Sequence, residues 1–473
     1  MAAGICDILN WLAGSEAILR AESAFPSAST AAGGEDRISA LHDHLLRDIV
    51  SRLPARDAAR TAALASRWRH LWRSTPLVLH DPHLLPSRQP ELAAAVARVL
   101  AGHPGPFATV SIRCCDFRRQ TLELAECPRL LAAKGVRDLV LVNNMAADLD
   151  HLPDAPAEVL SCASLRRLLL GYFRFPDTGA GREEGLFPHL RELTLLGVHM
   201  PDCDNFDHLL ARSPVLDTLV LVLSRIFHHI HLCSQSLKSA LLWSYYAQET
   251  AVMACPLLES LILCDVSFGE GDSVAVKIAA APKLRVLGYL EPRVHQLNIG
   301  GNLIKPDTKP SPSTVVLSVK ILALKVNFGV LKEVKMLASF LRCFPNIEML
   351  HIESLLGDER TRKHNAKFWR ELCPIECLKS HVTEMIVHEF RGDRSEMEFL
   401  KFVDRSANEM WYLLVRTTAE IFASADEMDE LMTKMEDFTH RGWVCDHSIV
   451  VVGEPLEENL WSFSKASDLS ADK

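Results

Sequence analysis

Residues 36–72 read DRISALHDHLLRDIVSRLPARDAARTAALASRWRHLW. The stretch is dense in apolar residues and is interrupted once, at Leu53-Pro54. A segment of fewer than about 40 residues rarely folds without a metal, a disulfide or a partner. We therefore expect its apolar face to cover something else, either another protein or the rest of this chain.

Helical spacing runs through the first part of this stretch, at Leu41, Leu45, Leu46, Ile49 and Leu53. Pro54 forbids continuation of that helix, because its ring removes a donor and clashes with the preceding turn. Asp57 and Ser66 stand where the N-caps of a second and a third helix belong. Three short helices with apolar residues on more than one side predict a small bundle with one face left for a partner. The alternative is a helical cap on the domain that follows.

The same stretch resembles the F-box of plant substrate receptors for ubiquitin ligases. The resemblance is carried by residues 36–39, Leu41, Asp43, Leu45-Leu46, Ile49, Leu53-Pro54, residues 58–64 and residues 67–72. In that family the motif binds the Skp-type adaptor of an SCF (Skp, cullin, F-box) ligase. The resemblance therefore implies an adaptor, and through it a cullin, as partners, with these adaptor-binding residues: Leu41, Leu45, Leu46, Ile49, Leu53 and Pro54. The family usually has proline after the residue at position 41; His42 stands there in this chain, which leaves the first turn less pre-organised.

Composition places the chain among globular proteins. Its 473 residues suffice for two or three domains, and hydrophobic and charged shares of 48% and 23% are ordinary for such domains. A net charge of −9 without a basic tract argues against nucleic acid or an anionic membrane surface as a partner. No apolar run reaches the roughly 20 residues that span a bilayer, and the N-terminus lacks the basic region of a signal peptide. Thirteen cysteines without a repeating spacing indicate a reducing compartment, the cytoplasm or the nucleus.

A repeat begins beyond about residue 105. The pattern L-x-x-L-x-L starts at Leu165, Leu190, Leu216, Leu258 and Ile347, with weaker copies at Val136, Leu237, Leu284 and Val319. From Leu165 to Leu284 the successive spacings are 25, 26, 21, 21 and 26 residues, within the roughly 20 to 29 residues of a leucine-rich repeat. This regularity favours an irregular leucine-rich-repeat solenoid over an α/β domain with several leucine-rich strands.

The spacing of the leucines also fits a stack of strands. L-x-L places alternate side chains on one face of a strand, and a stack of units can bury the face that a single unit leaves open. Segments such as HLLARSP and ETAVMACP are expected to cover the convex side as small helices or loops. Residues 291–318 break the period and are expected to form an insertion loop.

The character of the sequence changes from Cys377 onward. Residues 378–417 indicate a strand, a turn at Gly392, a helix capped by Ser395 and a second strand. This order resembles the FBD domain that follows leucine-rich repeats in many plant F-box proteins. A further helix near 426–438 and a last strand at 448–452 are expected to complete that domain. Together the three segments resemble the plant F-box/LRR/FBD family.

The expected fold class is α/β, with five segments in sequence. They are an N-terminal disordered linker (1–35), a three-helix F-box (36–76), an irregular leucine-rich-repeat solenoid (105–372), an α+β FBD-like domain (373–453) and a disordered tail (454–473).

Catalytic signatures are missing from the sequence. It contains no P-loop, dinucleotide-binding, nucleophile-elbow or H-E-x-x-H motif. His228-His229, His231 and Cys233 lack a second pair at the spacing of a closed zinc site, so no metal site is expected. We expect no catalytic residue and no cofactor; ubiquitin transfer would belong to the partner enzymes, to which this chain supplies proximity.

A target would bind to the exposed strand positions of the solenoid, because curvature makes that sheet a long concave surface. The candidate substrate-binding residues flank the leucines of each repeat: Glu192, Thr194, Thr218, Val220, Ser260, Ile262, Met349, His351 and Glu353. Several are apolar, which favours a protein target. The sequence therefore predicts the substrate-recognition subunit of an SCF-type ligase. The alternative is a repeat scaffold without a ligase role, in which the apolar residues of 41–54 would be buried against the first repeat.

Overall fold

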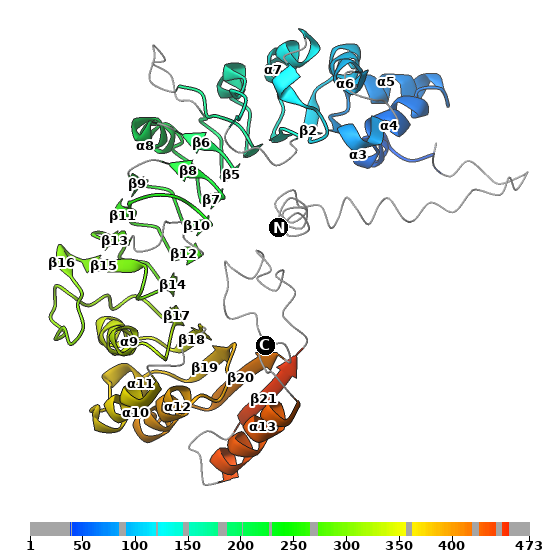
Figure 1. The fold of residues 1–473 in the computed structure, drawn as a ribbon. Coiled ribbons are helices and arrows are strands. Elements are labelled where there is room, and N and C mark those ends of the chain that lie inside the picture. Colours follow the sequence, from blue (N-terminus) through cyan, green and yellow to red (C-terminus); the bar gives the residue numbers. More distant parts are fainter. Residues whose placement is uncertain are drawn as a thin grey trace, which may run out of the picture. The chain divides into compact units, whose positions relative to one another are not determined.

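The computed structural model describes residues 38, 40–84, 91–119, 122–144, 151–177, 187–200, 202–226, 229–264, 273–355, 362–418, 425–440 and 447–453. The chain divides into two compact units, Met1–Phe227 and His228–Lys473, and each is described by itself (Figure 1). The expected linker at 1–35 and the expected tail at 454–473 lie outside the described residues.

Three helices open the described part of the first unit: α3 (Asp43–Arg52), α4 (Ala55–Thr61) and α5 (Ser66–Ser74). Pro54 separates the first two, as the loss of its backbone donor requires. The side chains that meet between the helices are apolar and buried: Leu46, Val50, Ala58, Trp68 and Leu71. The predicted three-helix bundle is therefore confirmed.

The helix caps differ from the sequence prediction. The N-cap positions are His42, Pro54 and Ala65, and none of them caps its helix with a side chain. Asp57 and Ser66 lie inside the first turns instead, because each helix begins earlier than their side chains would dictate.

The start of α3 is held by an arginine from α5. Arg67 donates from Nε to a carboxylate oxygen of Asp43 at 2.7 Å and from Nη2 to the carbonyl of Leu41 at 2.6 Å. The Arg67 guanidinium thereby lowers the pKa of Asp43. A contact between the first and third helices thus fixes the start of α3.

A parallel sheet follows the helices in the first unit. Its strands lie in chain order: β1 (Leu77–His80), β2 (Phe107–Ile112), β3 (Asp138–Val142), β4 (Arg167–Gly171), β5 (Glu192–Leu196) and β7 (Thr218–Val222). Leu168, Leu193 and Leu219 pair in register across three of these strands and are buried. The repeat pattern therefore marks both the strands and their alignment.

The strands of the first unit are joined by helices and short turns. These are η1 (Asp81–Leu84), α6 (Glu91–Gly102), η2 (Phe117–Arg119), α7 (Leu122–Ala133), η3 (Ala157–Ser161) and α8 (Cys203–Ala211). A small parallel pair, β6 (His199–Met200) and β8 (Arg225–Ile226), accompanies them. The segment HLLARSP begins in α8, so the prediction of a small helix there is confirmed.

The second unit continues the same architecture. Its main parallel run contains β10 (Ser239–Trp243), β12 (Ser260–Cys264), β14 (Val286–Leu290), β17 (Ile321–Val326), β18 (Met349–Ser354), β19 (Glu384–His388), β20 (Tyr412–Thr418) and β21 (His447–Gly453). The helices are α9 (Leu331–Cys343), α10 (Arg362–Glu371), α11 (Glu376–Ser380), α12 (Arg394–Ser406) and α13 (Ala425–His440). The predicted strand, helix and strand after residue 378 are β19, α12 and β20, and β19 pairs in parallel with β18. The FBD-like region therefore extends the repeat sheet.

A second sheet in this unit replaces two expected loops. It contains β9 (His229–Cys233), β11 (Glu249–Ala254), β13 (Val274–Ile278), β15 (His295–Ile299) and β16 (Asn302–Leu303), which Figure 1 shows beside β10 to β14. Most of the segment ETAVMACP, expected as a small helix or loop, and part of the expected insertion loop at 291–318 are strands of this sheet, so both predictions were wrong there. Alternate residues of β9, β13 and β15, such as Ile230, Val276 and Leu297, are buried, and this period-two burial stabilises strands over loops.

A buried carboxyl group holds the turn before α12. Glu396 Oε2 accepts hydrogen bonds from the backbone N–H groups of Asp393 at 2.8 Å and Arg391 at 3.2 Å, which completes a capping box with Asp393. The other oxygen accepts from the hydroxyl of Ser354 on β18. Only 1% of Glu396 is exposed, and this burial raises the pKa of Glu396 to about 7.

We predict that Glu396→Gln removes a pH dependence of the folding stability. The folded chain binds this proton more tightly than the unfolded chain does, so its contribution is complete below about pH 4.5 and is lost as the pH rises through about 7. Since one pKa unit corresponds to about 1.4 kcal/mol, the wild type should lose on the order of 3 kcal/mol relative to the variant between pH 4.5 and pH 8. Denaturant unfolding of both proteins across this range measures the difference, and parallel pH profiles would contradict it.

Candidate functional site

The first helix carries apolar residues on two sides. Leu46 and Val50, one turn apart, are completely buried in the helical bundle. Leu45 and Ile49, also one turn apart, are 42% and 38% exposed. The exposed pair is as apolar as the buried pair beside it. An exposed apolar pair of this kind often marks a protein interaction site.

The other predicted adaptor-binding residues divide into two groups. Leu41, Leu53 and Pro54 are half-buried at the ends of α3, where they border the exposed pair. Leu46 is fully buried, so its assignment to the adaptor-binding surface was wrong; it packs inside the bundle because it shares a helix face with Val50. Leu64, which is 68% exposed, is apolar and accessible in the same helical segment, and sequence reasoning did not single it out.

Arginine dominates the charge of these helices. Residues 43–74 contain seven arginines and three aspartates, a surplus of four positive charges in a chain whose net charge is −9. Two of the aspartates, Asp48 and Asp57, pair with Arg52 and Arg60 on their own helices at 2.8 and 3.0 Å. The three helices are therefore basic overall, whereas the whole chain is acidic.

In the first unit, the predicted target-binding residues share one face of two neighbouring strands. Glu192 pairs with Thr218, and Thr194 pairs with Val220, in the register of β5 and β7. Glu192 is exposed and Thr218 half-buried, whereas Thr194 and Val220 are 8% and 4% exposed. The expectation of exposed positions was wrong for the latter two, because side chains at strand centres about 4.8 Å apart shield one another.

The second unit repeats this distribution. Ser260 and Ile262 on β12 are buried, as are Met349 and His351 on β18. Glu353, at the carboxyl end of β18, is half-buried and forms an ion pair of 3.2 Å with Lys325 of β17. The structure thus brings the predicted residues onto the same sheet face in each unit, and leaves Glu192, Thr218 and Glu353 accessible.

A row of charges borders this face in the first unit. Asp138, Arg167 and Glu192 are register neighbours at the start of β3, β4 and β5. Arg167 donates from Nε and Nη2 to the two carboxylate oxygens of Asp138, both at 2.9 Å. This two-pronged geometry fixes the arginine more firmly than a single contact would.

An apolar cluster lies beside the charge row. Val140, Val142 and Leu169 pack together, with the ring of Tyr172 against them. Sequence reasoning missed this cluster, although the weak repeat copy at Val136 places Val140 and Val142 at the flanking strand positions. Val140, Val142 and Leu169 are themselves buried, so in the first unit the half-buried Tyr172 and the charge row are the accessible parts of this face.

Three family models match successive parts of the chain. The F-box domain model covers residues 38–80. The model described as "FBD-associated F-box protein At5g56370, LRR repeats" covers residues 124–352, and the FBD model covers residues 370–410. Their order is the order expected from the sequence.

Similarity to whole proteins agrees with these matches. The chain is 24% identical over 402 residues to the F-box/FBD/LRR-repeat protein At3g49040 of Arabidopsis thaliana, an alignment that covers 80% of this chain and 87% of the relative. The chain carries an F-box, leucine-rich repeats and an FBD segment, the domain set of the plant F-box/FBD/LRR-repeat proteins that it resembles. Two more Arabidopsis thaliana relatives are F-box/LRR-repeat protein At3g26922 (26% identity over 54% of this chain and 74% of the relative) and F-box/FBD/LRR-repeat protein At5g22660 (56% identity over 10% of each).

Two of the thiols, those of Cys114 and Cys377, are poorly suited to nucleophilic chemistry. Burial raises the pKa of Cys114 to about 11 and the pKa of Cys377 to about 12. Burial also lowers the pKa of His388, which is stacked on His351 at 6.2 Å, to about 3. A thiol that stays protonated and a histidine that stays neutral at pH 7 have structural roles as buried groups.

The position of Tyr172 depends on a tight approach from the next repeat. Tyr172 and Gly197 both adopt left-handed backbone conformations, with φ values of 59° and 56°. A Cβ atom at Gly197 would lie 2.5 Å from Cδ1 of the tyrosine ring. Glycine is therefore required at 197 both for its backbone conformation and for the space that it leaves.

We predict that Gly197→Ala destabilises the chain by about 2 to 4 kcal/mol, the sum of left-handed strain and overpacking against the ring. Gly135→Ala is the matched control, since Gly135 has φ of 62° and no neighbouring atom within 4 Å of the added carbon. The control should cost only about 1 to 2 kcal/mol. Urea unfolding midpoints measure both variants, and equal losses would show that Tyr172 does not constrain position 197.

Proposed function

We propose that this chain is the substrate-recognition subunit of an SCF-type ubiquitin ligase. Leu45 and Ile49 on α3 bind a Skp-type adaptor and, through it, a cullin. The observation that carries the proposal is the division of α3, in which Leu46 and Val50 build the bundle core and leave a second apolar pair in water. Resemblance to the plant F-box/FBD/LRR-repeat proteins supports the same role.

The charge of the F-box also bears on the partner. Four surplus positive charges over residues 43–74 favour an adaptor whose docking face combines an apolar depression with acidic residues. Complementary charge would speed the encounter and set its orientation, while the apolar pair would supply most of the binding free energy.

If the chain were a repeat scaffold without a ligase role, Leu45 and Ile49 should be buried. A helical segment that only caps the repeats would bury its apolar pair against the first strand. Part of the segment does contact that strand, through a bridge between Pro54 and Val78 of β1. Leu45 and Ile49 nevertheless remain accessible, which favours the receptor.

The target is proposed to be a protein held on the sheet face of the repeats. In the first unit, Glu192, Thr218 and the half-buried Tyr172 offer charged, hydrogen-bonding and apolar contacts; in the second unit, Glu353 offers a charged one. Such mixed surfaces suit protein partners. The chain would contribute proximity between the target and the transfer enzymes, which carry the chemistry of ubiquitination.

This role places the protein in the cytoplasm or the nucleus. The ten cysteines with described side chains are free thiols, as a reducing compartment favours. Among the described residues, no helix has both the length and the apolar character needed to cross a bilayer.

We predict that Leu45→Asp with Ile49→Asp abolishes co-purification with a plant Skp-type adaptor and leaves the chain folded. Both side chains already contact water, so the charges cost little in the free protein, but they would cost several kcal/mol when buried at an interface. A micromolar complex is worth about 8 kcal/mol, so this loss is sufficient to abolish capture.

The matched control is Leu303→Asp with Leu317→Asp, which places the same charges at two exposed leucines of the second unit. The control should bind the adaptor as the wild type does, and circular dichroism should show native folding for both variants. If a well-folded wild type fails to bind the adaptor, or if the Leu45 and Ile49 variant binds equally well, the proposal is wrong.

We predict that His42→Pro strengthens the adaptor-binding helix. The backbone of His42 has φ of −66° at the N-cap of α3, which is the angle that the proline ring imposes. Proline at a compatible position stabilises by about 0.4 to 1 kcal/mol, because the unfolded chain has fewer conformations to lose. Thermal unfolding and the adaptor dissociation constant measure the effect; a lower melting temperature would show that the backbone at position 42 does not tolerate proline.

A further inference from the structure

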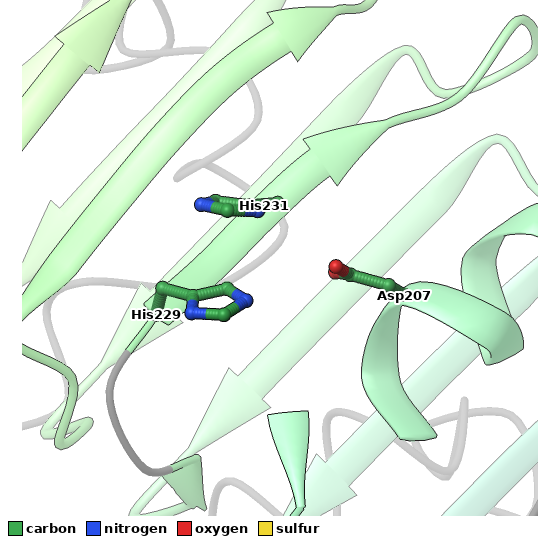
Figure 2. A group of neighbouring side chains, drawn as sticks. All are labelled: Asp207, His229 and His231. Carbon is green, nitrogen blue, oxygen red and sulfur yellow. The ribbon is translucent and has the colours of Figure 1, made fainter. Parts of the chain in front are cut away.

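Two histidines share one face of an edge strand in the second sheet. His229 and His231 are two residues apart on β9, and Figure 2 shows their rings facing one another. Both are half-buried, and the ring centroids are 3.9 Å apart. A ring nitrogen of one lies within 4.8 Å of a ring nitrogen of the other. Residues at i and i+2 of a strand point the same way, so both imidazoles can reach a common ligand.

The neighbouring strand supplies a carboxylate to the same face. Glu249 of β11 pairs with His229 in the parallel register. Its Oε1 atom lies 3.7 Å from Nε2 of His231. Two ligand atoms that each lie about 2.1 Å from a tetrahedral ion are roughly 3.4 Å apart, so this pair is close to the separation that a shared ion requires.

The carboxylate is oriented by a lysine from the strand beyond. Lys277 of β13 lies 2.6 Å from Oε2 of Glu249, the oxygen that does not face His231. This ion pair fixes the carboxylate and directs Oε1 toward the histidines. Such an outer contact is the usual way in which a protein orients a metal-binding group.

We propose that His229, His231 and Glu249 bind a divalent transition-metal ion, with Zn²⁺ as the best fit. Two imidazoles and one carboxylate are ligands that zinc accepts, and water would complete the four-coordinate shell. The ligand atoms of His231 and Glu249 are already near the separation that a shared ion requires, and His229 lies on the same face of β9 as His231. The site is independent of adaptor binding, and the proposal departs from the sequence-based expectation that this histidine cluster holds no metal.

The test is isothermal titration of the full chain with ZnCl₂ alone. The affinity at this site should fall at least about 100-fold in the His229→Ala, His231→Ala variant, which loses two ligands. At zinc concentrations that saturate the wild-type site, the wild type should therefore bind one more equivalent than this variant. Glu249→Gln keeps the size of the side chain and should weaken the same equivalent by about 10-fold or more. Zinc should also raise the melting temperature of the wild type, but not that of the histidine variant.

The chain offers a matched control in a second histidine pair. His42 and His44 are also two residues apart, with stacked rings 5.9 Å apart, but they lie at the start of a helix. His42→Ala, His44→Ala should therefore retain the zinc equivalent. The proposal fails if the His229, His231 variant binds as many equivalents as the wild type with the same affinities, or if the wild type binds no zinc more tightly than the Glu249→Gln variant.

Discussion

The constraint on which each unit depends is that no repeat can bury its own leucines. Leu168, Leu193 and Leu219 are completely or almost completely buried because each strand lies in register with the next. A slip of one residue would turn every leucine to the opposite face. The parallel register is therefore the source of stability, and it also decides which residues remain on the face that is left for a partner.

The same logic explains the composition of the sheet face. Its central positions are shielded by neighbours, so apolar residues such as Val140, Leu169 and Val220 are buried there, the first two beside the ring of Tyr172. In the first unit, charges lie where the strands begin, as in the Asp138 and Arg167 pair. In the F-box, by contrast, one helix supplies both a core and an exposed apolar pair. The chain thus has two different kinds of surface, a small apolar patch on α3 and longer sheet faces with mixed chemistry.

Sequence reasoning succeeded where a period or a forbidden conformation governs the structure. The leucine spacing located the strands, Pro54 separated two helices, and the alternation after Cys377 predicted β19, α12 and β20. It failed where contacts between distant residues decide. The caps of α4 and α5 were misassigned because each helix begins earlier than Asp57 and Ser66 indicate. Leu46 was misplaced because helical spacing alone does not show which apolar side faces the bundle core.

The second sheet was unpredictable for a related reason. Segments such as 249–254 are too short for their sequence to distinguish a strand from a loop, and here parallel neighbours supply the hydrogen bonds of a strand. The proposed zinc ligands share this origin, since His231 and Glu249 are 18 residues apart in sequence and meet through strand pairing. Candidate sites that depend on pairing partners therefore require the structure, whereas the α3 surface follows from local sequence once its buried side is known.

The central claim is that α3 presents its second apolar face to an adaptor. Hydrogen–deuterium exchange of the full chain, with and without a plant Skp-type adaptor, tests it most directly. Addition of the adaptor should slow exchange within residues 41–54 and leave exchange along β5 and β7 unchanged. Protection confined to the repeat strands, or no protection at α3 under conditions in which the two proteins co-purify, would contradict the account.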